Sequence, residues 1–398
     1  MNLQDLAWRI AIRHELPVRR ARDAFIRGLG LLALLLAKLP GSSLRFGPPR
    51  AFTVDTFEWA GAASVPRYEI DPPSVVRRSV DAAGQPLPFV FEALQEWPIR
   101  RNFVVELEDA RVWGPSAVPI ASDDTLLADL ELFSIQKPSE LPIRHRLRLG
   151  RAQHLAGRTA TLVGPFPQSY HHWILDLLPR LDLLQSAGTE FDQVLVPPMR
   201  AFHRETLERA GVSLSAVVVH EKKSYRSLDR LVLPSFPGQY GQATPRVCDY
   251  VRELFSAEIA GRQETKRLYV GRGDASRRRL RNEDEVLAML KPLGFEEVSM
   301  AGHTVAEQAE LLASAEAVVG AHGGALTNLV FCQPGTKVVE LFGARYTPGC
   351  YWAIAVTLGL RYLPLFQEND AAHNGAQWTD YTVSPARVTA ALRHLGIA

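Results

Sequence analysis

Residues 317–331, AVVGAHGGALTNLVF, place a histidine and two glycines directly after a run of apolar residues. Glycines allow the backbone to turn sharply and to approach a ligand closely, and a helix that begins there points unbonded N–H groups at one place. Such a helix end binds anions such as phosphate. His322, Gly323 and Gly324 therefore predict an anion site at a strand end, where open α/β sheets bind ligands. A plain strand-to-helix turn is the alternative.

A run of arginines follows the predicted strand 267–271 in the stretch LYVGRGDASRRRLRNEDEV. Guanidinium groups bind two phosphate oxygens at once, so arginines in a loop after a buried strand suit a diphosphate. Arg272 is nearest to the strand end and is the best candidate, with Arg279 next. The alternative is a solvated charged loop in which Asn282 and Glu283 begin the next helix.

A third stretch, SYHHWILDLLPRL, predicts an acid–base pair on a helix. His172 and Asp176 are four residues apart and so share one helix face. Sugar transfer with inversion needs a base of this kind to deprotonate the attacking hydroxyl. A surface Asp176 beside a core Trp173 is the alternative. The pair His171 and His172 also raises a metal, but no third ligand follows at the spacing of a zinc site, so no metal is predicted.

The loop PSFPGQYG, residues 234–241, lies near the predicted domain junction. Its aromatic and amide side chains, Gln239 and Tyr240 among them, could stack on a sugar or a base, although a purely structural loop is more common.

These segments lie on a strand–helix alternation that begins near residue 158 and favours parallel sheets covered on both faces. Strands are predicted at 159–164, 193–198, 216–220, 230–235, 267–271, 296–300, 317–321, 337–342 and 361–366. Short segments with turn residues between 103 and 130 predict β-hairpins. The expected fold is α/β, with two facing Rossmann-like domains and a small β-rich N-terminal addition. The predicted divisions are 1–40 (basic and apolar helix), 41–157 (β-rich), 158–244 (acceptor-side domain), 245–380 (donor domain) and 381–398 (C-terminal helix).

The composition of the 398 residues, 46% hydrophobic and 22% charged with a net charge of +2, is that of a folded soluble protein without general affinity for nucleic acid. Three scattered cysteines predict neither disulfides nor a zinc site and fit a reducing cytosol. The apolar run 29–37 is too short to span a bilayer. Because arginines precede it, residues 1–40 could contact the inner face of a membrane; packing on the protein body is the alternative.

Taken together, the helix HHWILDLLPRL, the loop PSFPGQYG, the basic run and the stretch EQAELLASAEAVVGAHGGALTNLVFCQPGTKVVELF resemble glycosyltransferase family 61 over residues 100–370. That family includes bacterial polysaccharide-building enzymes, plant xylosyl- and arabinosyltransferases and O-linked N-acetylglucosamine transferases. The matched positions are His172, Trp173, Asp176, Pro179, Arg180, Arg272, Arg279, Asn282, Glu283, Glu307, Gln308, His322, Gly323, Ala325, Leu326, Asn328 and Phe331. Two departures are Ser169, where the family has asparagine, and the order Gly324-Ala325 in place of Ala-Gly.

The resemblance implies a GT-B-like fold and transfer, with inversion, from a nucleoside-diphosphate sugar to a glycan, in bacterial surface or capsular polysaccharide synthesis. It implies no covalent cofactor and leaves a divalent metal open. The predicted donor contacts are Arg272, Arg279, Asn282, His322, Gly323, Gly324, Ala325, Asn328 and Glu340; the catalytic residues are Asp176 and His172; the sugar contacts are His171, Trp173, Gln239 and Tyr240. A nucleotide-sugar epimerase or phosphorylase, or a non-catalytic carbohydrate-binding protein, is the alternative.

Overall fold

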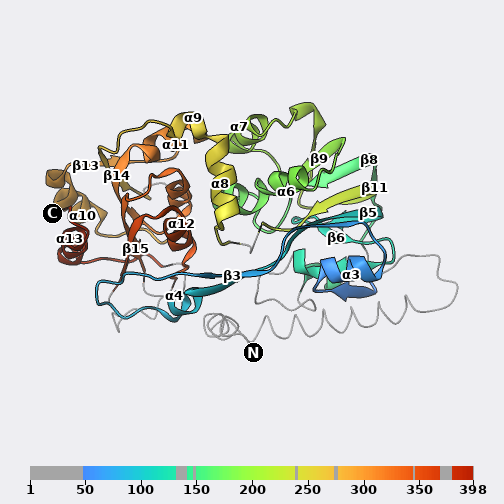
Figure 1. Cartoon of the computed structure of the whole chain (residues 1–398), viewed down its shortest axis with the longest axis horizontal. Helices are drawn as coiled ribbons and strands as arrows, with labels where there is room; N and C mark the ends of the chain where they lie inside the picture. Colours follow the sequence, from blue (N-terminus) through green and yellow to red (C-terminus); the bar gives the residue numbers. More distant parts are fainter. Residues whose placement is uncertain are drawn as a thin grey trace.

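The computed structural model describes residues 48–130, 141–146, 149–237, 241–272, 277–343, 346–367 and 379–397. In this part of the chain the protein is a mixed α/β structure with a nine-stranded sheet, a five-stranded sheet and a two-stranded ribbon. Figure 1 shows the two large sheets side by side along the long axis, with helix α8 (Pro245–Leu254) between them. The α/β class predicted from the sequence is therefore confirmed.

The nine-stranded sheet combines the N-terminal region with the first strand–helix series. In spatial order its strands are β1 (Ala51–Thr53), β7 (Thr125–Leu127), β6 (Val118–Ile120), β5 (Asn102–Trp113), β11 (Tyr225–Pro234), β8 (Gln153–Thr161), β9 (Gln193–Val196) and β10 (Val217–Val219), with β2 (Arg67–Asp71) also beside β5. Strands β11, β8, β9 and β10 run parallel, as the sequence predicts for this series. The antiparallel pairing of β5 with β6 and of β6 with β7 confirms the predicted hairpins.

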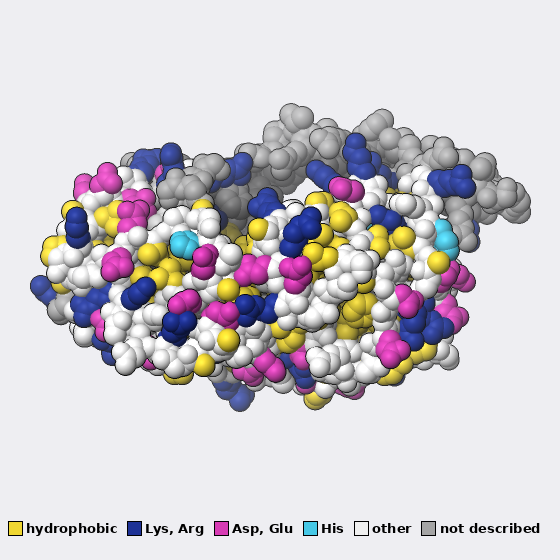
Figure 2. Space-filling model, turned by 90° about the horizontal axis from the view of Figure 1, so that it is seen from above, with side chains coloured by type: hydrophobic (Ala, Val, Ile, Leu, Met, Phe, Trp, Pro, Cys, Tyr) yellow, Lys and Arg dark blue, Asp and Glu magenta, His cyan; other side chains and the backbone are white. Residues whose placement is uncertain are grey.

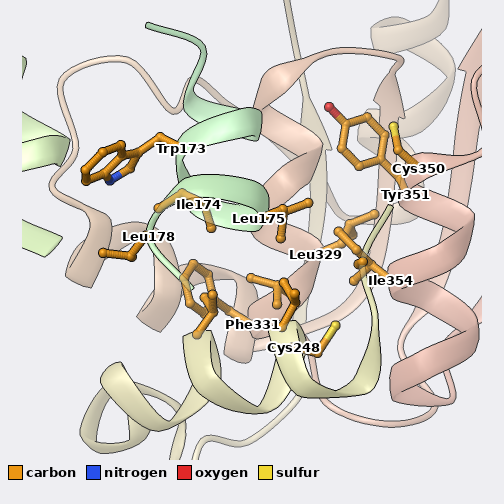
Figure 3. Close-up of a cluster of buried hydrophobic side chains, with 14 of the residues drawn as sticks. Trp173, Ile174, Leu175, Leu178, Cys248, Leu329, Phe331, Cys350, Tyr351 and Ile354 are labelled. Carbon is orange, nitrogen blue, oxygen red and sulfur yellow. The ribbon is translucent and has the colours of Figure 1, made fainter. Parts of the chain in front are cut away.

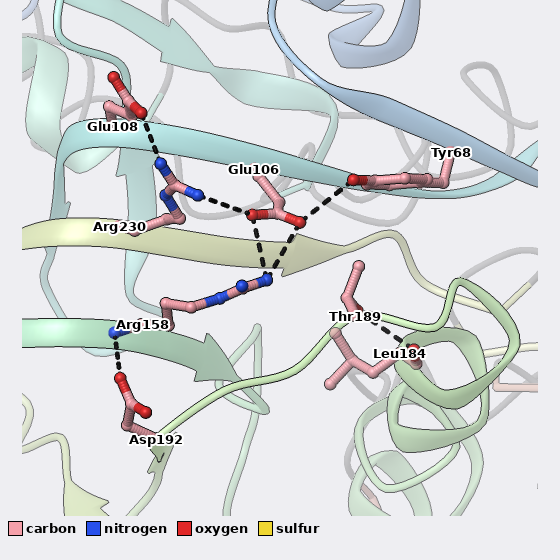
Figure 4. Close-up of polar contacts among 8 residues, drawn as sticks. All are labelled: Tyr68, Glu106, Glu108, Arg158, Leu184, Thr189, Asp192 and Arg230. Carbon is pink, nitrogen blue, oxygen red and sulfur yellow. Dashed lines mark hydrogen bonds and ion pairs between the residues drawn. The ribbon is translucent and has the colours of Figure 1, made fainter.

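The nine-stranded sheet spans the boundary predicted between residues 157 and 158. Strand β5 pairs antiparallel with β11, so residues from both sides of that boundary share one sheet. A buried carboxylate also links these strands (Figure 4): Glu106 of β5 accepts a hydrogen bond from Arg158 of β8 at 3.3 Å and lies 3.6 Å from Arg230 of β11. Tyr68 of β2 donates to the same carboxylate at 3.3 Å. Local patterns could not reveal this pairing, because it joins segments far apart in the chain.

The five-stranded sheet is entirely parallel. Its strands, in spatial order, are β13 (Phe295–Val298), β12 (Lys266–Val270), β14 (Ala315–Ala321), β15 (Lys337–Phe342) and β16 (Arg361–Phe366). All five strands predicted for this series are thus confirmed. The chain passes from β12 outward to β13, returns to β14 on the other side of β12, and continues outward. The strand order therefore reverses between β12 and β14, which makes their carboxyl ends a topological switch point.

Both faces of this sheet are covered, which explains why its strands are continuous apolar runs. On one face, Tyr269 and Val319 pack with α10 (Glu283–Leu290) and α13 (Pro385–His394). On the other face, Leu268 and Val318 pack with α11 (Val305–Ala313), α12 (Cys350–Leu358) and α8. Alternate residues of a strand point to opposite faces, so the two cores use alternate positions of β12 and β14.

A helical segment after β8 joins the two sheets through one core. It consists of a short α5 (Tyr170–His172), a π-helical turn (Trp173–Leu177) and α6 (Arg180–Ser186), with Pro179 as the break that the sequence predicts. Figure 3 shows Ile174, Leu175 and Leu178 of this segment packed toward Leu329 and Phe331 of the 3₁₀-helix η7 (Gly324–Phe331), beside α8. This shared core therefore fixes the positions of the side chains at the adjoining ends of the two sheets relative to one another.

A strap formed by residues 74–99 runs from the nine-stranded sheet to the five-stranded sheet (Figure 1). It contains the ribbon β3 (Ser74–Arg77) with β4 (Glu96–Ile99), and helix α4 (Phe89–Leu94). Phe91 of α4 packs against Phe342, Trp352 and Phe366 with ring centroids 5.4 to 5.8 Å apart. The N-terminal region is thus not only β-rich, since part of it is a helix on the second sheet; α3 (Thr56–Ala62) is a further helix there.

No helix among the described residues is long and apolar enough to cross a membrane. Residues 1–40, the predicted membrane contact, lie outside the described residues. Figure 2 shows basic and acidic side chains interspersed on one face, without a large patch of one sign there.

Candidate active site

Arg272 and Gly323 meet at the switch point of the five-stranded sheet. Arg272 follows β12, and its Nη1 donates to the carbonyl oxygen of His322, which follows β14, at 2.9 Å. A Cβ atom at Gly323 would lie 1.6 Å from that Nη1. The backbone of Gly323 is extended, with φ of −179°, so the close approach of the arginine, and not the backbone conformation, is what a side chain here would disturb. The arginine therefore lies directly over the turn, as the two predicted anion-binding segments require.

Gly324 is placed differently from its neighbour. It is exposed, and a Cβ atom there would meet nothing within 4 Å. The first hydrogen bond of η7 runs from Leu326 N to the carbonyl of Gly323 at 2.9 Å, so the amides of Gly324 and Ala325 are not used by the helix. Backbone donors of this kind bind phosphate oxygens.

His322 is held by a buried carboxyl group. Its Nδ1 lies 2.5 Å from Oε1 of Glu340, which is 0% exposed, and Tyr362 donates its hydroxyl proton to the other carboxyl oxygen. Burial lowers the pKa of His322 well below its usual value, and the charges of Arg278 and Arg272 lower it further. Burial raises the pKa of Glu340 well above its usual value. Both directions favour an uncharged pair that fixes the imidazole ring.

The second arginine near His322 is Arg278, and the sequence ranked Arg279 above it. The guanidinium of Arg278 lies 4.5 Å from the ring centroid of Tyr346, and the Tyr346 ring contacts the His322 ring at 5.3 Å. Arg279 instead forms an ion pair with Asp380 at 3.0 Å. Asn282, also predicted on the donor side, donates to the carbonyl of Val383 at 2.8 Å. The C-terminal segment thus engages Arg279 and Asn282.

The predicted acid–base pair is present on the helical segment after β8. Nδ1 of His172 lies 2.7 Å from Oδ2 of Asp176, and Oδ1 of Asp176 accepts a hydrogen bond from Gly241 N at 2.7 Å. The side chain of Asp176 is 2% exposed and that of His172 is 19% exposed. Burial raises the pKa of Asp176, and the hydrogen bonds from His172 and Gly241 oppose this effect. Of the two side chains, His172 is the one open to solvent.

His171 connects this pair with the second sheet. Its Nδ1 lies 3.2 Å from Oγ1 of Thr327 in η7, and its ring contacts the rings of His172 and Tyr351 with centroids 5.0 and 5.5 Å away. Tyr351 in turn contacts His322 with ring centroids 5.1 Å apart. Burial lowers the pKa of His171 well below its usual value, so it stays uncharged. The two groups of predicted site residues therefore meet through His171 and Tyr351.

Several predicted positions are directed into the protein. Trp173 is fully buried, and its Nε1 donates to Thr206 at 2.8 Å. Asn328 accepts from Tyr170 at 2.6 Å and donates to Gln308 at 2.6 Å. These side chains join the helical segment, α11 and η7, and both are fully buried. The predicted sugar contacts Gln239 and Tyr240 lie outside the described residues.

The family model described as Glycosyltransferase 61 matches residues 170–339, which contain the His172–Asp176 pair, Arg272 and the turn at His322.

Residues 170–339 belong to glycosyltransferase family 61.

A comparison with curated proteins found no match. Family membership implies a sugar donor and an acceptor as substrates. The matched segment begins on the helix after β8 and ends in β15, so it includes elements from both large sheets.

This family 61 protein has a third possible metal ligand beside its histidine pair. His171, His172 and Asp176 each offer a ligand atom, and these atoms lie within 4.8 Å of one another. Histidine and carboxylate donors suit zinc and other first-row divalent ions. The third ligand comes from the helix itself, four residues after His172, a spacing that the sequence interpretation assigned to an acid–base pair.

Sequence reasoning missed Thr327, Tyr351 and Arg278 as neighbours of the site. Thr327 stands within the glycine motif, directly before the predicted contact Asn328, and this position could have marked it as a site residue. Tyr351 belongs to α12, after β15, and nothing in its local sequence marks it. Arg278 is one of three consecutive arginines. The path of the loop, which the sequence does not reveal, decides that Arg278 and not Arg279 lies near His322.

Proposed function

We propose that this protein transfers a sugar from a nucleoside-diphosphate sugar to a hydroxyl group of a glycan, with inversion at the anomeric carbon. The observation that carries the proposal is the placement of Arg272 over the turn at His322 and Gly323, at a switch point, with the His172–Asp176 pair reached through His171. We further propose a GT-B-like division, in which the five-stranded sheet holds the donor and the nine-stranded sheet supplies the base.

On the donor side, the diphosphate binds the amides of Gly324 and Ala325, which the helix does not use, together with Arg272 and Arg278. Arginine forks and helix N-termini both favour phosphate oxygens. Negative charge grows on the leaving nucleoside diphosphate as the bond to the anomeric carbon breaks. Hydrogen-bonding groups already fixed beside the leaving diphosphate stabilise the transition state more than the ground state.

In the proposed site, His322 binds the donor through Nε2, because its Nδ1 is engaged by Glu340. Glu340, which the sequence predicts as a donor contact, then acts as a positioning residue. Both of its carboxyl oxygens already have protein partners, His322 and Tyr362, and it is 0% exposed.

On the acceptor side, Nε2 of His172 takes the proton of the attacking hydroxyl. The hydroxyl oxygen forms the new bond to the anomeric carbon, and the electron pair of the broken bond leaves with the diphosphate. Asp176 holds the imidazole by Nδ1 and balances its positive charge, as carboxylates do for catalytic histidines. Participation in polysaccharide synthesis, a cytoplasmic location and a membrane contact stay predictions from the sequence.

The proposal is tested in two steps. A thermal-shift screen of UDP, GDP, CMP and their sugars identifies the nucleotide, because a ligand of the folded state raises its apparent stability. The bound donor is then incubated with glycan acceptors, and the anomeric configuration of the product is read by proton NMR. An inverted product supports the proposal. Isomerised donor without transfer would favour an epimerase, and the absence of any nucleotide shift would overturn the donor site.

A further inference from the structure

An exposed aromatic ring lies next to the proposed base. Phe166 is 62% exposed, and its ring stacks on that of His172 with centroids 5.6 Å apart and an interplanar angle of 25°. It follows the carboxyl end of β8, the edge at which parallel sheets bind ligands. Trp173 and Tyr351, two other aromatic residues at this site, are buried.

The backbone holds this ring outward. Phe166 has a φ of 47°, in the left-handed region that bulky residues rarely adopt and that concentrates at functional sites. It stands between two prolines, and its carbonyl accepts from Ser169 N at 3.0 Å. The next residues are anchored as well: Pro167 O lies 3.2 Å from Nε2 of His203, and Gln168 donates to Pro198 O at 2.7 Å. The exposure of Phe166 is therefore built into an anchored loop.

We propose that Phe166 is the platform on which a pyranose ring of the acceptor stacks, so that its hydroxyl reaches His172. The C–H face of a pyranose is apolar and flat, which suits the face of an aromatic ring. The ring stands on the His172 side of the site, whereas the phosphate-binding groups stand at Arg272 and Gly324. This inference rests on the proposed function and adds to it a positioning residue for the acceptor sugar.

Two variants remove the ring from the full chain. Phe166→Ala keeps the backbone restraint, and Phe166→Gly accepts a positive φ without strain, so one of them stays folded even where the other does not. Phe166→Trp keeps a platform and is the rescue variant. Phe52→Ala is the matched control, since Phe52 is 47% exposed and lies on β1, at the far edge of the same sheet.

The probes are the methyl glycosides of glucose, galactose, mannose and xylose, with binding measured by saturation-transfer NMR. We expect the wild type, Phe52→Ala and Phe166→Trp to bind at least one glycoside through its ring C–H protons. Phe166→Ala and Phe166→Gly should bind that glycoside about 3- to 10-fold more weakly. The thermal shift produced by UDP, GDP or CMP should be the same in all variants.

Three results would overturn the platform: no glycoside bound by the wild type, unchanged binding in both ring-deletion variants, or a loss of nucleotide shift in those variants, which would place Phe166 at the donor. Failure of the proposed function is distinct from all three. It would appear in the wild type as the absence of any nucleotide shift, whatever the glycosides do.

Discussion

The two large sheets present their polar side chains to the candidate site in different ways. In the five-stranded sheet, Arg272 and His322 directly follow the carboxyl ends of the neighbouring strands β12 and β14. Beside the nine-stranded sheet, His172 and Asp176 lie on the helical segment after β8, whose position depends on packing against η7 and α8. Strand order alone places the first group, whereas a shared core places the second.

The two groups also differ in charge and burial. The group at β12 and β14 combines Arg272 and Arg278 with backbone amides that η7 does not use, which favours an anion without any proton transfer. The other group contains a buried carboxyl whose pKa is raised, next to a more exposed imidazole. Under the proposed function, the five-stranded sheet binds the donor and the group beside the nine-stranded sheet moves a proton, so variants of the two groups should fail in different measurements.

The largest effect is expected for Asp176→Asn. The amide keeps the shape of the side chain but cannot balance a charged His172, so turnover should fall by about 10³-fold or more. Donor affinity should stay unchanged, because the diphosphate is held by the other sheet. Steady-state rates with saturating donor give the first value, and calorimetry with the nucleotide gives the second. Turnover near the wild-type rate would remove Asp176 from the mechanism.

A smaller effect distinguishes the two adjacent glycines. Gly323→Ala places a Cβ where the guanidinium of Arg272 lies, so the arginine must leave the His322 carbonyl and nucleotide affinity should fall by about 10-fold. Gly324→Ala meets open space and should change affinity by no more than about 3-fold. Equal losses in the two variants would mean that the Arg272 contact does not contribute to binding.

The pH dependence of turnover should show the protonation of the buried Asp176 carboxyl. Because burial raises the pKa of Asp176, its carboxylate is lost at a higher pH than that of an ordinary aspartate, and activity falls as the pH falls through that value. Asp176→Asn lacks this carboxyl, so the acid limb of the wild type should be steeper than that of the variant. Turnover is measured from about pH 4 to about pH 9. Acid limbs of equal slope would show that the carboxyl does not titrate in the active enzyme.

Chelation should have the smallest effect. His172 and Asp176 are hydrogen-bonded to each other, and the proposed function assigns the balance of the diphosphate charge to arginines. Dialysis against EDTA should therefore leave turnover within about 2-fold of its starting value. If activity is lost and then restored by Mn²⁺ or Zn²⁺, the cluster of His171, His172 and Asp176 is a metal site and the division between the sheets changes.

Sequence reasoning was most successful where local patterns determine structure. The five parallel strands, the break at Pro179 and the glycine turn all follow from apolar runs and residues with special backbone behaviour. The spacing of His172 and Asp176 also sufficed, since a helix fixes which residues share a face.

It was least successful where contacts cross the chain. The pairing of β5 with β11, the strap 74–99 on the second sheet and the place of Tyr351 all depend on tertiary packing that no local pattern records. The choice between Arg278 and Arg279 depended on Asp380, a residue far along the chain that engages Arg279. Glu340 was predicted as a donor contact because it is an acidic residue on the strand after the glycine motif, but its partners His322 and Tyr362 enclose it.

The most direct test of the division between the sheets is nucleotide affinity, measured by calorimetry in Arg272→Ala and Asp176→Asn side by side. We predict that Arg272→Ala binds the nucleoside diphosphate about 10- to 100-fold more weakly than the wild type, since it loses a charge-assisted contact. Asp176→Asn should bind it as the wild type does. Wild-type affinity in Arg272→Ala, or an equal loss in both variants, would contradict a donor site on the five-stranded sheet.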